Sequence, residues 1–198
     1  MISEALLMQY GAHKFSVRKK EVLFHLDSRP QYFYQVHQGR IKMNYFNEDG
    51  KEFIQGIFTA GQSFGEPPLF EELSYPAQAE AVEDSVLWKL EKSNFFTLLK
   101  ANPEVHLELT KVLASRLHYK ATMVAEISTE NPEHRLLKLI DYFKVHIYHI
   151  PIETPYLVEL SRQQLADLTG LRVETVIRAI KSLEKKGELS LESHKIRR

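Results

Sequence analysis

The stretch SRQQLADLTGLRVETVIRAIKSLEKKG, from Ser161 to Gly187, has the pattern of two short helices joined by a tight turn. Ser161 and Gln164 have the spacing of a capping box, which marks the start of the first helix. Gly170 can adopt the left-handed backbone conformation that ends a helix. The stretch therefore predicts a helix-turn-helix.

The second helix of this stretch is expected to have one apolar and one polar face. Apolar residues recur at helical spacing from Val176 to Leu183. Charged and hydroxyl side chains occupy the other face: Arg172, Glu174, Thr175, Arg178, Lys181 and Lys185. Such a face is typical of a helix that reads bases in the major groove, although a helical hairpin with merely solvated charges has the same pattern.

The residues after the second helix have the pattern of a β-hairpin. Gly187–Leu191 is a short strand signal, residues 192–195 can turn, and Ile196–Arg198 can return. A hairpin in this place is the layout of a winged helix, whose basic side chains, such as Lys195, can reach phosphates. From Pro155 onward there are nine basic and six acidic residues, a net charge of +3 in a chain whose formal net charge is zero. A mildly basic C-terminal module is compatible with DNA binding.

The composition excludes several classes of site. There is no cysteine, which excludes disulfides, thiolate nucleophiles and cysteine-held zinc or iron–sulfur sites. No apolar run approaches the roughly 20 residues that span a bilayer. The N-terminal residues lack the basic cluster of a signal peptide, so we expect a cytoplasmic protein without a membrane partner.

Residues 12 to about 90 are predicted to form strands, because short runs rich in Phe, Tyr, Val and Ile alternate with turn residues. Many short strands at regular spacing indicate a β-sandwich or jelly roll. The stretch from Gly65 to Glu72 interrupts them as a loop that leads into a helical turn. The predicted strands are Glu21–Leu26, Tyr32–Val36, Arg40–Phe46, Glu52–Phe58, Ala77–Val82 and Val86–Leu90.

Helices are predicted to follow the strands. Ser93 is expected to cap the first, and the second is long, from Pro103 to about Ile127. It carries two apolar stripes, so it can pack on its own domain and on a second copy of itself; we favour this over burial in a monomer. The stripes are Val105, Leu109, Val112 and Met123, and Leu113, Leu117, Val124 and Ile127.

The rest of the chain predicts a hinge, a helix and a linker before the helix-turn-helix. The hinge is Ser128–Pro132, and Tyr156–Leu160 is expected to be a strand. The predicted fold class is α+β, with a double-stranded β-helix or jelly-roll sensor domain, a long dimerisation helix and a winged helix-turn-helix. The corresponding ranges are 1–102, 103–128 and 129–198.

This layout resembles the Crp/Fnr family of bacterial transcription regulators over essentially the whole chain. The motifs that carry the resemblance are Gly65-Glu66 with the following Leu69–Glu72, and the stretch LSRQQLADLTGLRVETVIRAIKSLEKKGEL. The resemblance implies a homodimer that binds double-stranded DNA under the control of a small-molecule effector, with RNA polymerase as a further partner.

In the recognition helix, the resemblance implies that Glu174 and Arg178 read the core base pairs of each half-site. A carboxylate accepts a hydrogen bond from cytosine, and an arginine binds guanine or a phosphate. The two lie one turn apart and can also brace each other. Val173 stands where cyclic-AMP-responsive members have a second base-reading arginine, so Val173 and Ile177 are expected to contact thymine methyl groups. The expected phosphate contacts are Arg172, Thr175, Lys181 and, in the wing, Lys195.

In the sensor domain, the resemblance implies a cyclic-nucleotide-type pocket, but one that lacks its anion contact. Family members that bind a cyclic nucleotide have Arg-Ser about ten residues after Gly-Glu, where this chain has Pro76-Ala77. Burying a phosphate without a cation is costly, so we expect that the effector is not cyclic AMP. The candidate effector residues are Gly65, Glu66, Pro76, Ala77 and, on the long helix, Lys120.

Alternative functions find less support in the sequence. The oxygen-sensing Fnr branch needs cluster-binding cysteines, and haem-binding members need an axial ligand, for which His25, His37, His106 and His118 are the alternatives to ordinary surface histidines. His146 and His149 have i, i+3 spacing without a third metal ligand. A cupin-like metalloenzyme needs a His-x-His pair, which is absent. Glu71-Glu72 are interpreted as solvated acids. We therefore expect no catalytic residue, no metal and no cofactor, and a ligand-binding module without DNA is disfavoured by the wing.

Overall fold

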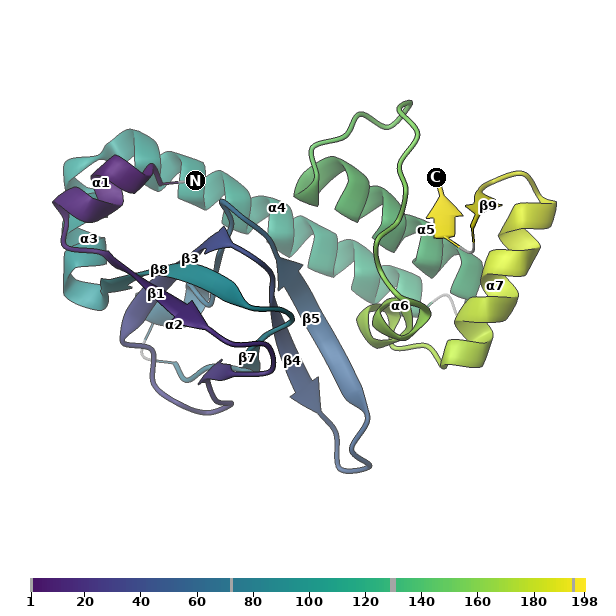
Figure 1. Cartoon of the computed structure of the whole chain (residues 1–198), viewed down its shortest axis with the longest axis horizontal. Coiled ribbons are helices and arrows are strands. Elements are labelled where there is room, and N and C mark those ends of the chain that lie inside the picture. The colour runs from purple at the N-terminus through teal and green to yellow at the C-terminus, as the bar shows by residue number, and fades with distance from the viewer. Residues whose placement is uncertain (1, 72, 129–130, 194) are drawn as a thin grey trace. The chain divides into compact units, whose positions relative to one another are not determined.

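The computed structural model describes residues 2–71, 73–128, 131–193 and 195–198 (Figure 1). The chain divides into two compact units, residues 1–113 and 114–198. The division lies inside the long helix α4 (Pro103–Ser128), so this helix contributes residues to both units.

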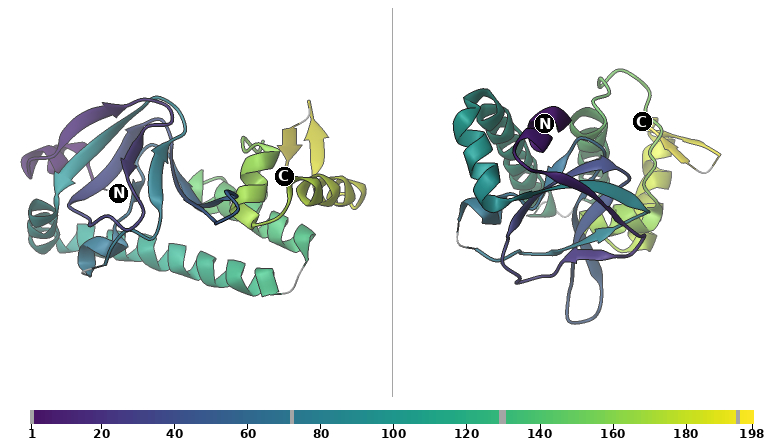
Figure 2. Two further views of the ribbon diagram at one scale, coloured as in Figure 1. Left: turned by 90° about the horizontal axis from the view of Figure 1, so that it is seen from below. Right: turned by 60° about the vertical axis from the view of Figure 1, so that its left-hand side comes forward.

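The first unit contains a roll made of two antiparallel four-stranded sheets in the described residues (Figure 2). The first sheet has the order β1 (His13–Val17), β8 (Ser85–Glu91), β3 (Tyr32–Gln38), β6 (Ser63–Phe64). The second sheet has the order β2 (Val22–Phe24), β7 (Gln78–Ala81), β4 (Ile41–Phe46), β5 (Glu52–Phe58). The predicted jelly-roll type of fold is confirmed.

Most predicted strands are confirmed to within a few residues, but β1 and β6 were not predicted. The turn between β4 and β5 contains Gly50 with a φ of +73°, as its left-handed role required. Gly39 has a φ of +91°, and a Cβ atom there would lie 2.8 Å from the Cα of Ser85. The reversal before β4 therefore needs glycine for both its backbone conformation and its close approach.

The core of the roll is apolar and rich in aromatic rings. A second cluster joins the roll to α1 (Glu4–Gln9), α3 (Lys92–Ala101) and the first part of α4. Here Phe33 and Phe95 stack with ring centroids 4.5 Å apart. The prediction that Ser93 caps α3 is wrong, because the helix already begins at Lys92 after an extended Glu91.

The long helix α4 has one covered and one exposed side. Of the first predicted stripe, Leu109 and Met123 are buried. Of the second, Leu117 is 69% exposed and Val124 67% exposed, as expected for a stripe that is not covered within one chain. Leu113 departs from this expectation, because it is half-buried against the apolar cluster of the first unit. The side chain of Ile127 lies outside the described residues.

The second unit contains α5 (Pro132–Tyr142), the π-helical turn η1 (Phe143–Ile147), α6 (Arg162–Thr169), α7 (Val173–Lys185) and the hairpin of β9 (Ser190–Glu192) and β10 (Lys195–Arg197). The prediction of a strand over Tyr156–Leu160 is wrong, since Leu157 makes only an isolated bridge to Arg197. The predicted hinge includes residues 129–130, which lie outside the described residues, as do Glu72 and His194.

No helix in the described part of the chain combines the length and the apolar character that crossing a membrane requires.

Candidate nucleic-acid interface and effector site

The helix-turn-helix is formed by α6 and α7, and its ends are fixed by local hydrogen bonds. Both halves of the predicted capping box are present: the Gln164 N–H donates to Ser161 Oγ over 3.1 Å, and the Ser161 N–H donates to Gln164 Oε1 over 2.9 Å. Gly170 ends α6 with a φ of +70° in the left-handed region. These bonds satisfy helix-terminal groups that would otherwise lack partners.

The turn between α6 and α7 is also held from α5, by Arg135, which no local motif in the sequence marks. Arg135 is buried, and its Nη1 donates to the carbonyl oxygen of Thr169 over 3.2 Å. The Thr169 hydroxyl donates to the Leu165 carbonyl over 2.6 Å. A guanidinium at the last carbonyls of a helix is favourable both as a donor and as a charge at the negative end of the helix dipole.

The recognition helix α7 is amphipathic as predicted. Val176, Ala179, Ile180 and Leu183 are buried. The other side of α7 faces solvent, so its polar groups are available to a partner. Its predicted DNA-contacting residues are exposed at Arg172, Glu174, Ile177, Arg178 and Lys181, and half-buried at Val173 and Thr175.

Glu174 and Arg178 lie on the exposed side of α7, but they do not brace each other. Among the ion pairs and side-chain hydrogen bonds of the described residues, none joins these two side chains, so that part of the prediction is wrong. Arg172 is the N-cap residue of α7, and its side chain makes no capping bond. The structure thus leaves the carboxylate of Glu174 and the guanidinium of Arg178 directed to solvent.

The wing is anchored at its base. Arg198 donates to Asp141 on α5 over 2.9 and 3.1 Å, and to the Glu188 carbonyl over 2.6 Å. Main-chain hydrogen bonds also join Tyr156 and Arg198 in both directions. Lys195 is exposed at the start of β10. The wing therefore has a fixed base and an exposed basic residue near its tip.

The candidate effector residues of the roll are packed, not open. Gly65 is buried with a φ of +71°, and a Cβ atom there would lie 3.1 Å from both Phe24 Cζ and Tyr75 Cε1. Glu66 is 1% exposed, and its carboxylate accepts a hydrogen bond from Ser63 Oγ. Pro76 is exposed, whereas Ala77 is fully buried on the strand side of the loop.

Four rings fill the roll interior beside Gly65. We call Phe24, Tyr34, Phe64 and Tyr75 the aromatic stack. Phe24 and Tyr75 lie face to face, with centroids 3.6 Å apart and planes 10° apart, and Tyr34 stacks on Phe64 at 5.7 Å. The only signal of this group in the sequence is the frequency of aromatic residues in the strands, which does not show which rings meet.

Burial changes the chemistry of the tyrosines in the aromatic stack. Burial raises the pKa of Tyr34 to about 12, with a smaller contribution from Tyr32. The pKa of Tyr75 is raised further by burial, and also by Tyr34 and by the nearby Glu66. The Tyr75 hydroxyl is buried and has no hydrogen-bond partner among the described residues. The interior around Glu66 therefore favours neutral, apolar groups, which is a poor environment for a phosphate.

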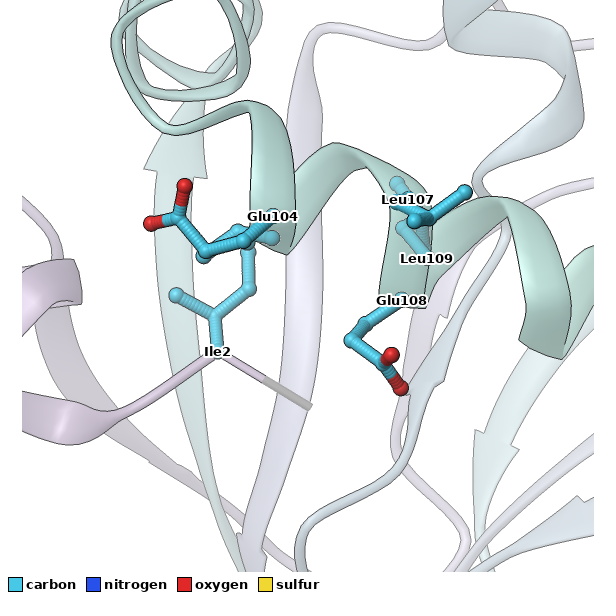
Figure 3. A pocket seen from close by; sticks show the side chains of 6 residues that line it. Ile2, Glu104, Leu107, Glu108 and Leu109 are labelled. Atoms are coloured by element: carbon cyan, nitrogen blue, oxygen red, sulfur yellow. The ribbon is translucent and has the colours of Figure 1, made fainter.

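Lys120 lies on α4 in the second compact unit, whereas the other four effector candidates lie in the first. Its side chain is exposed, and its pKa is lowered by partial desolvation and by the neighbouring Arg116. A surface hollow elsewhere in the first unit lies along the start of α4, where Ile2, Glu104, Leu107, Glu108 and Leu109 line it with Val105 (Figure 3). None of the candidate effector residues lines this hollow.

The histidines are dispersed. His25, His106 and His118 are exposed, and His37 contacts Glu4 through Nδ1 at 2.6 Å. His146 lies in the π-helical turn, and His149 follows that turn with a φ of +55°, so the two do not share one helical face. In the described ranges, no group of three or more His, Cys, Asp or Glu side chains is placed to hold a metal ion. Glu71 is exposed.

Two family models match the chain. The model for a cyclic nucleotide-binding domain matches residues 14–102, and that for a Crp-like helix-turn-helix domain matches residues 134–197. The chain is 27% identical over 173 residues to the cAMP-activated global transcriptional regulator CRP of Haemophilus influenzae, covering 87% of this chain and 76% of that protein. It is 24% identical over 180 residues to the fumarate and nitrate reduction regulatory protein of Yersinia pestis, covering 90% and 71%.

Solved structures share the fold at low sequence identity. A CooA mutant from Carboxydothermus hydrogenoformans matches with a TM-score of 0.80 and 18% identity, covering all of this chain and 86% of that one. The c-di-GMP responsive global regulator CLP of Xanthomonas campestris matches with a TM-score of 0.75 and 18% identity, covering 98% of both chains. These structures therefore share the fold of nearly the whole chain.

Proposed function

The chain belongs to the Crp/Fnr family of transcription regulators and carries a helix-turn-helix DNA-binding domain, and from this premise we propose that it binds a palindromic operator as a homodimer without using cyclic AMP as its effector. We propose RNA polymerase as a further protein partner. The observation that carries the proposal is the solvent-exposed polar face of α7 on a helix-turn-helix whose turn and ends are fixed by hydrogen bonds.

Base reading is assigned to Glu174 and Arg178. A glutamate carboxylate accepts from the amino group of cytosine, and an arginine donates to guanine O6 and N7. Since their side chains are exposed and not paired with each other, no internal ion pair has to be broken when DNA binds. Val173 and Ile177 supply methyl contacts to thymine. The phosphate contacts are Arg172, Thr175, Lys181 and Lys195.

The homodimer interface is assigned to one exposed side of α4, which we call the exposed seam. Residues along this side recur at intervals of three and four, which is the spacing of the apolar positions in a two-stranded coiled coil. All six side chains are exposed in the single chain, and small residues at several positions allow two helices to approach closely. The exposed seam consists of Leu107, Thr110, Ala114, Leu117, Ala121 and Val124.

The effector assignment rests on the aromatic stack and on Pro76-Ala77. A cyclic nucleotide would need a cation for its phosphate, and Pro76 and Ala77 offer neither a positive charge nor a hydroxyl. Phe24 and Tyr75 occupy the space next to Gly65 and Glu66. Binding a nucleotide there would require the rings to separate, with the loss of their buried contact area. An effector of another kind, acting near Lys120 or elsewhere, is compatible with this assignment.

The test is selection of duplexes from a random pool by the purified chain, followed by titration of the enriched duplex at two salt concentrations. The proposal predicts an inverted repeat whose half-sites lie one helical turn apart, roughly 34 Å, and binding that weakens steeply with salt because phosphates are neutralised. A control pool is offered to the chain with Arg178→Ala. Enrichment of no sequence, or of the same sequence by wild type and variant, would count against the proposed role of α7.

A further inference from the structure

The part of α4 in the second unit has two opposite faces, and only one belongs to the exposed seam. Leu117, Ala121 and Val124 lie on the exposed seam. Tyr119 is two positions from both Leu117 and Ala121, which places it about 200° around the helix from Leu117 at 3.6 residues per turn. A second chain on the exposed seam therefore leaves the face of Tyr119 free for contacts within its own chain.

Tyr119 uses that face to contact α5. Its ring stacks on the ring of Tyr142, with centroids 3.6 Å apart and planes 13° apart. Burial raises the pKa of both hydroxyls, as expected for rings that cover each other. Arg116 lies close enough to Tyr142 to oppose that rise. His146 stacks on Tyr142 at 5.2 Å.

This stack joins the helix that carries the exposed seam to the first helix of the DNA-binding module. Near the first turn of α5, at the opposite end from Tyr142, Arg135 holds the α6–α7 turn through Thr169, and Glu133 pairs with Lys186 beyond α7 at 2.6 Å. A continuous set of contacts therefore runs from Tyr119 through α5 to the recognition helix.

We propose that Tyr119 and Tyr142 are positioning residues that set the distance between the two recognition helices of the dimer, and so determine which half-site spacing the protein accepts. The inference rests on the proposed function, since it needs a dimer on an inverted repeat. The stacked rings resist rotation of α5 about the axis of α4. Each added base pair moves one half-site by about 3.4 Å along the duplex and turns it by roughly a tenth of a helical turn, so a rigid pair of modules accepts one spacing.

The experiment compares spacings, because general destabilisation does not change spacing preference. Fluorescence anisotropy measures the affinity of the full chain for the enriched inverted repeat, and for duplexes with the spacer lengthened or shortened by one and two base pairs. The proteins are wild type, Tyr142→Ala, Tyr142→Leu and Tyr119→Leu. Tyr142→Phe is the matched control that keeps the ring and loses the hydroxyl, and Tyr45→Ala removes an exposed tyrosine in the roll.

Wild type, Tyr142→Phe and Tyr45→Ala are expected to lose at least tenfold in affinity when the spacer changes by two base pairs. The Ala and Leu variants are expected to lose less than threefold, while thermal unfolding shows that they are folded. Equal spacing preference in Tyr142→Leu, Tyr119→Leu and wild type would overturn the inference and leave the proposed function intact. Failure of wild type to prefer any duplex is a failure of the proposed function instead.

Discussion

The outer face of α7 and the interior of the roll both carry charged side chains, but the surroundings of these charges are opposite. On α7, Glu174 and Arg178 are exposed and not paired with each other. In the roll, Glu66 is 1% exposed and accepts a hydrogen bond from Ser63. The first carboxylate is available to an outside donor, whereas the second already has one.

This contrast indicates which of the two regions needs a partner from outside the chain. Charged side chains that face solvent on α7 stay hydrated, so they cost the folded chain little free energy and are available to bases and phosphates. Ring faces in contact at 3.6 Å, such as those of Phe24 and Tyr75, already have their partner inside the chain. We therefore propose that α7 recognises DNA, and interpret the aromatic stack as part of the folded core.

The largest expected effect is on stability, through Tyr75. Replacing Tyr75 with Ala removes a fully buried ring, so the free energy of unfolding should fall by about 3–5 kcal/mol. Tyr75→Phe keeps the stacked ring and removes a hydroxyl that has no partner among the described residues, so it should be neutral or stabilising. Urea unfolding of the three proteins measures this. A mild effect of Tyr75→Ala, or improved binding of cyclic AMP by that variant, would indicate a ligand pocket at this point of the roll.

The next largest effect is expected on DNA binding, through the exposed face of α7. Glu174→Ala and Arg178→Ala should each weaken binding to the enriched duplex by about 1–3 kcal/mol, and relax the preference at one base pair of each half-site. Competition between matched and mismatched duplexes measures the preference. A loss that is the same for every DNA sequence would mean that these side chains touch only phosphate, and would remove the base-reading half of the comparison.

Alkaline pH tests the burial of the aromatic stack without changing the shape of any side chain. The pKa of Tyr34 is raised to about 12 in the folded chain, against about 10 when unfolded. Its contribution to stability is therefore fully present below about pH 10 and is lost as the pH rises toward about 12. At about pH 11 the expected loss is about 1.4 kcal/mol, and Tyr34→Phe should remove it. The matched control is Tyr45→Phe, at a ring that is 40% exposed. If Tyr34→Phe and Tyr45→Phe lose the same stability between about pH 10 and about pH 11, burial of Tyr34 in the roll is not the cause of the pH dependence.

The smallest effect is expected at the phosphate contacts. Lys181→Ala and Lys195→Ala should weaken binding by about 0.2–1 kcal/mol each, the range of an exposed ion pair, and to the same extent for all sequences. The slope of log affinity against log salt should decrease by about 1 for each lysine removed. Titrations at several salt concentrations measure that slope, and an unchanged slope would place the lysine outside the interface.

The DNA-binding half of the fold could be predicted from sequence because its signals are local. The capping box of Ser161 and Gln164 is set by residues three apart, and Gly170 fixes the helix end by its own backbone. The resemblance to the family then assigns base reading to Glu174 and Arg178, which remains a prediction. One local prediction failed for a local reason: α3 begins at Lys92, one residue before Ser93.

The interior of the roll could not be predicted in the same way, because its contacts are distant in sequence. Phe24 and Tyr75 come from different parts of the roll, and no spacing rule links them. The two-residue strand β6 is defined only by its pairing with β3. Tyr156–Leu160 has the composition of a strand, but its main-chain hydrogen bonds to residues 196–198 involve only Tyr156 and Val158, around the isolated bridge of Leu157 to Arg197. In these cases the partner in space determined the local structure, and the residue type alone did not.

The most direct test of the central claim is a titration of the enriched duplex with the purified chain, with and without cyclic AMP, in which stoichiometry and affinity are measured together. We predict two chains per duplex, and affinities that differ by less than tenfold, or 1.4 kcal/mol, between the two conditions. One chain per duplex, or binding that appears only with cyclic AMP, would contradict the account.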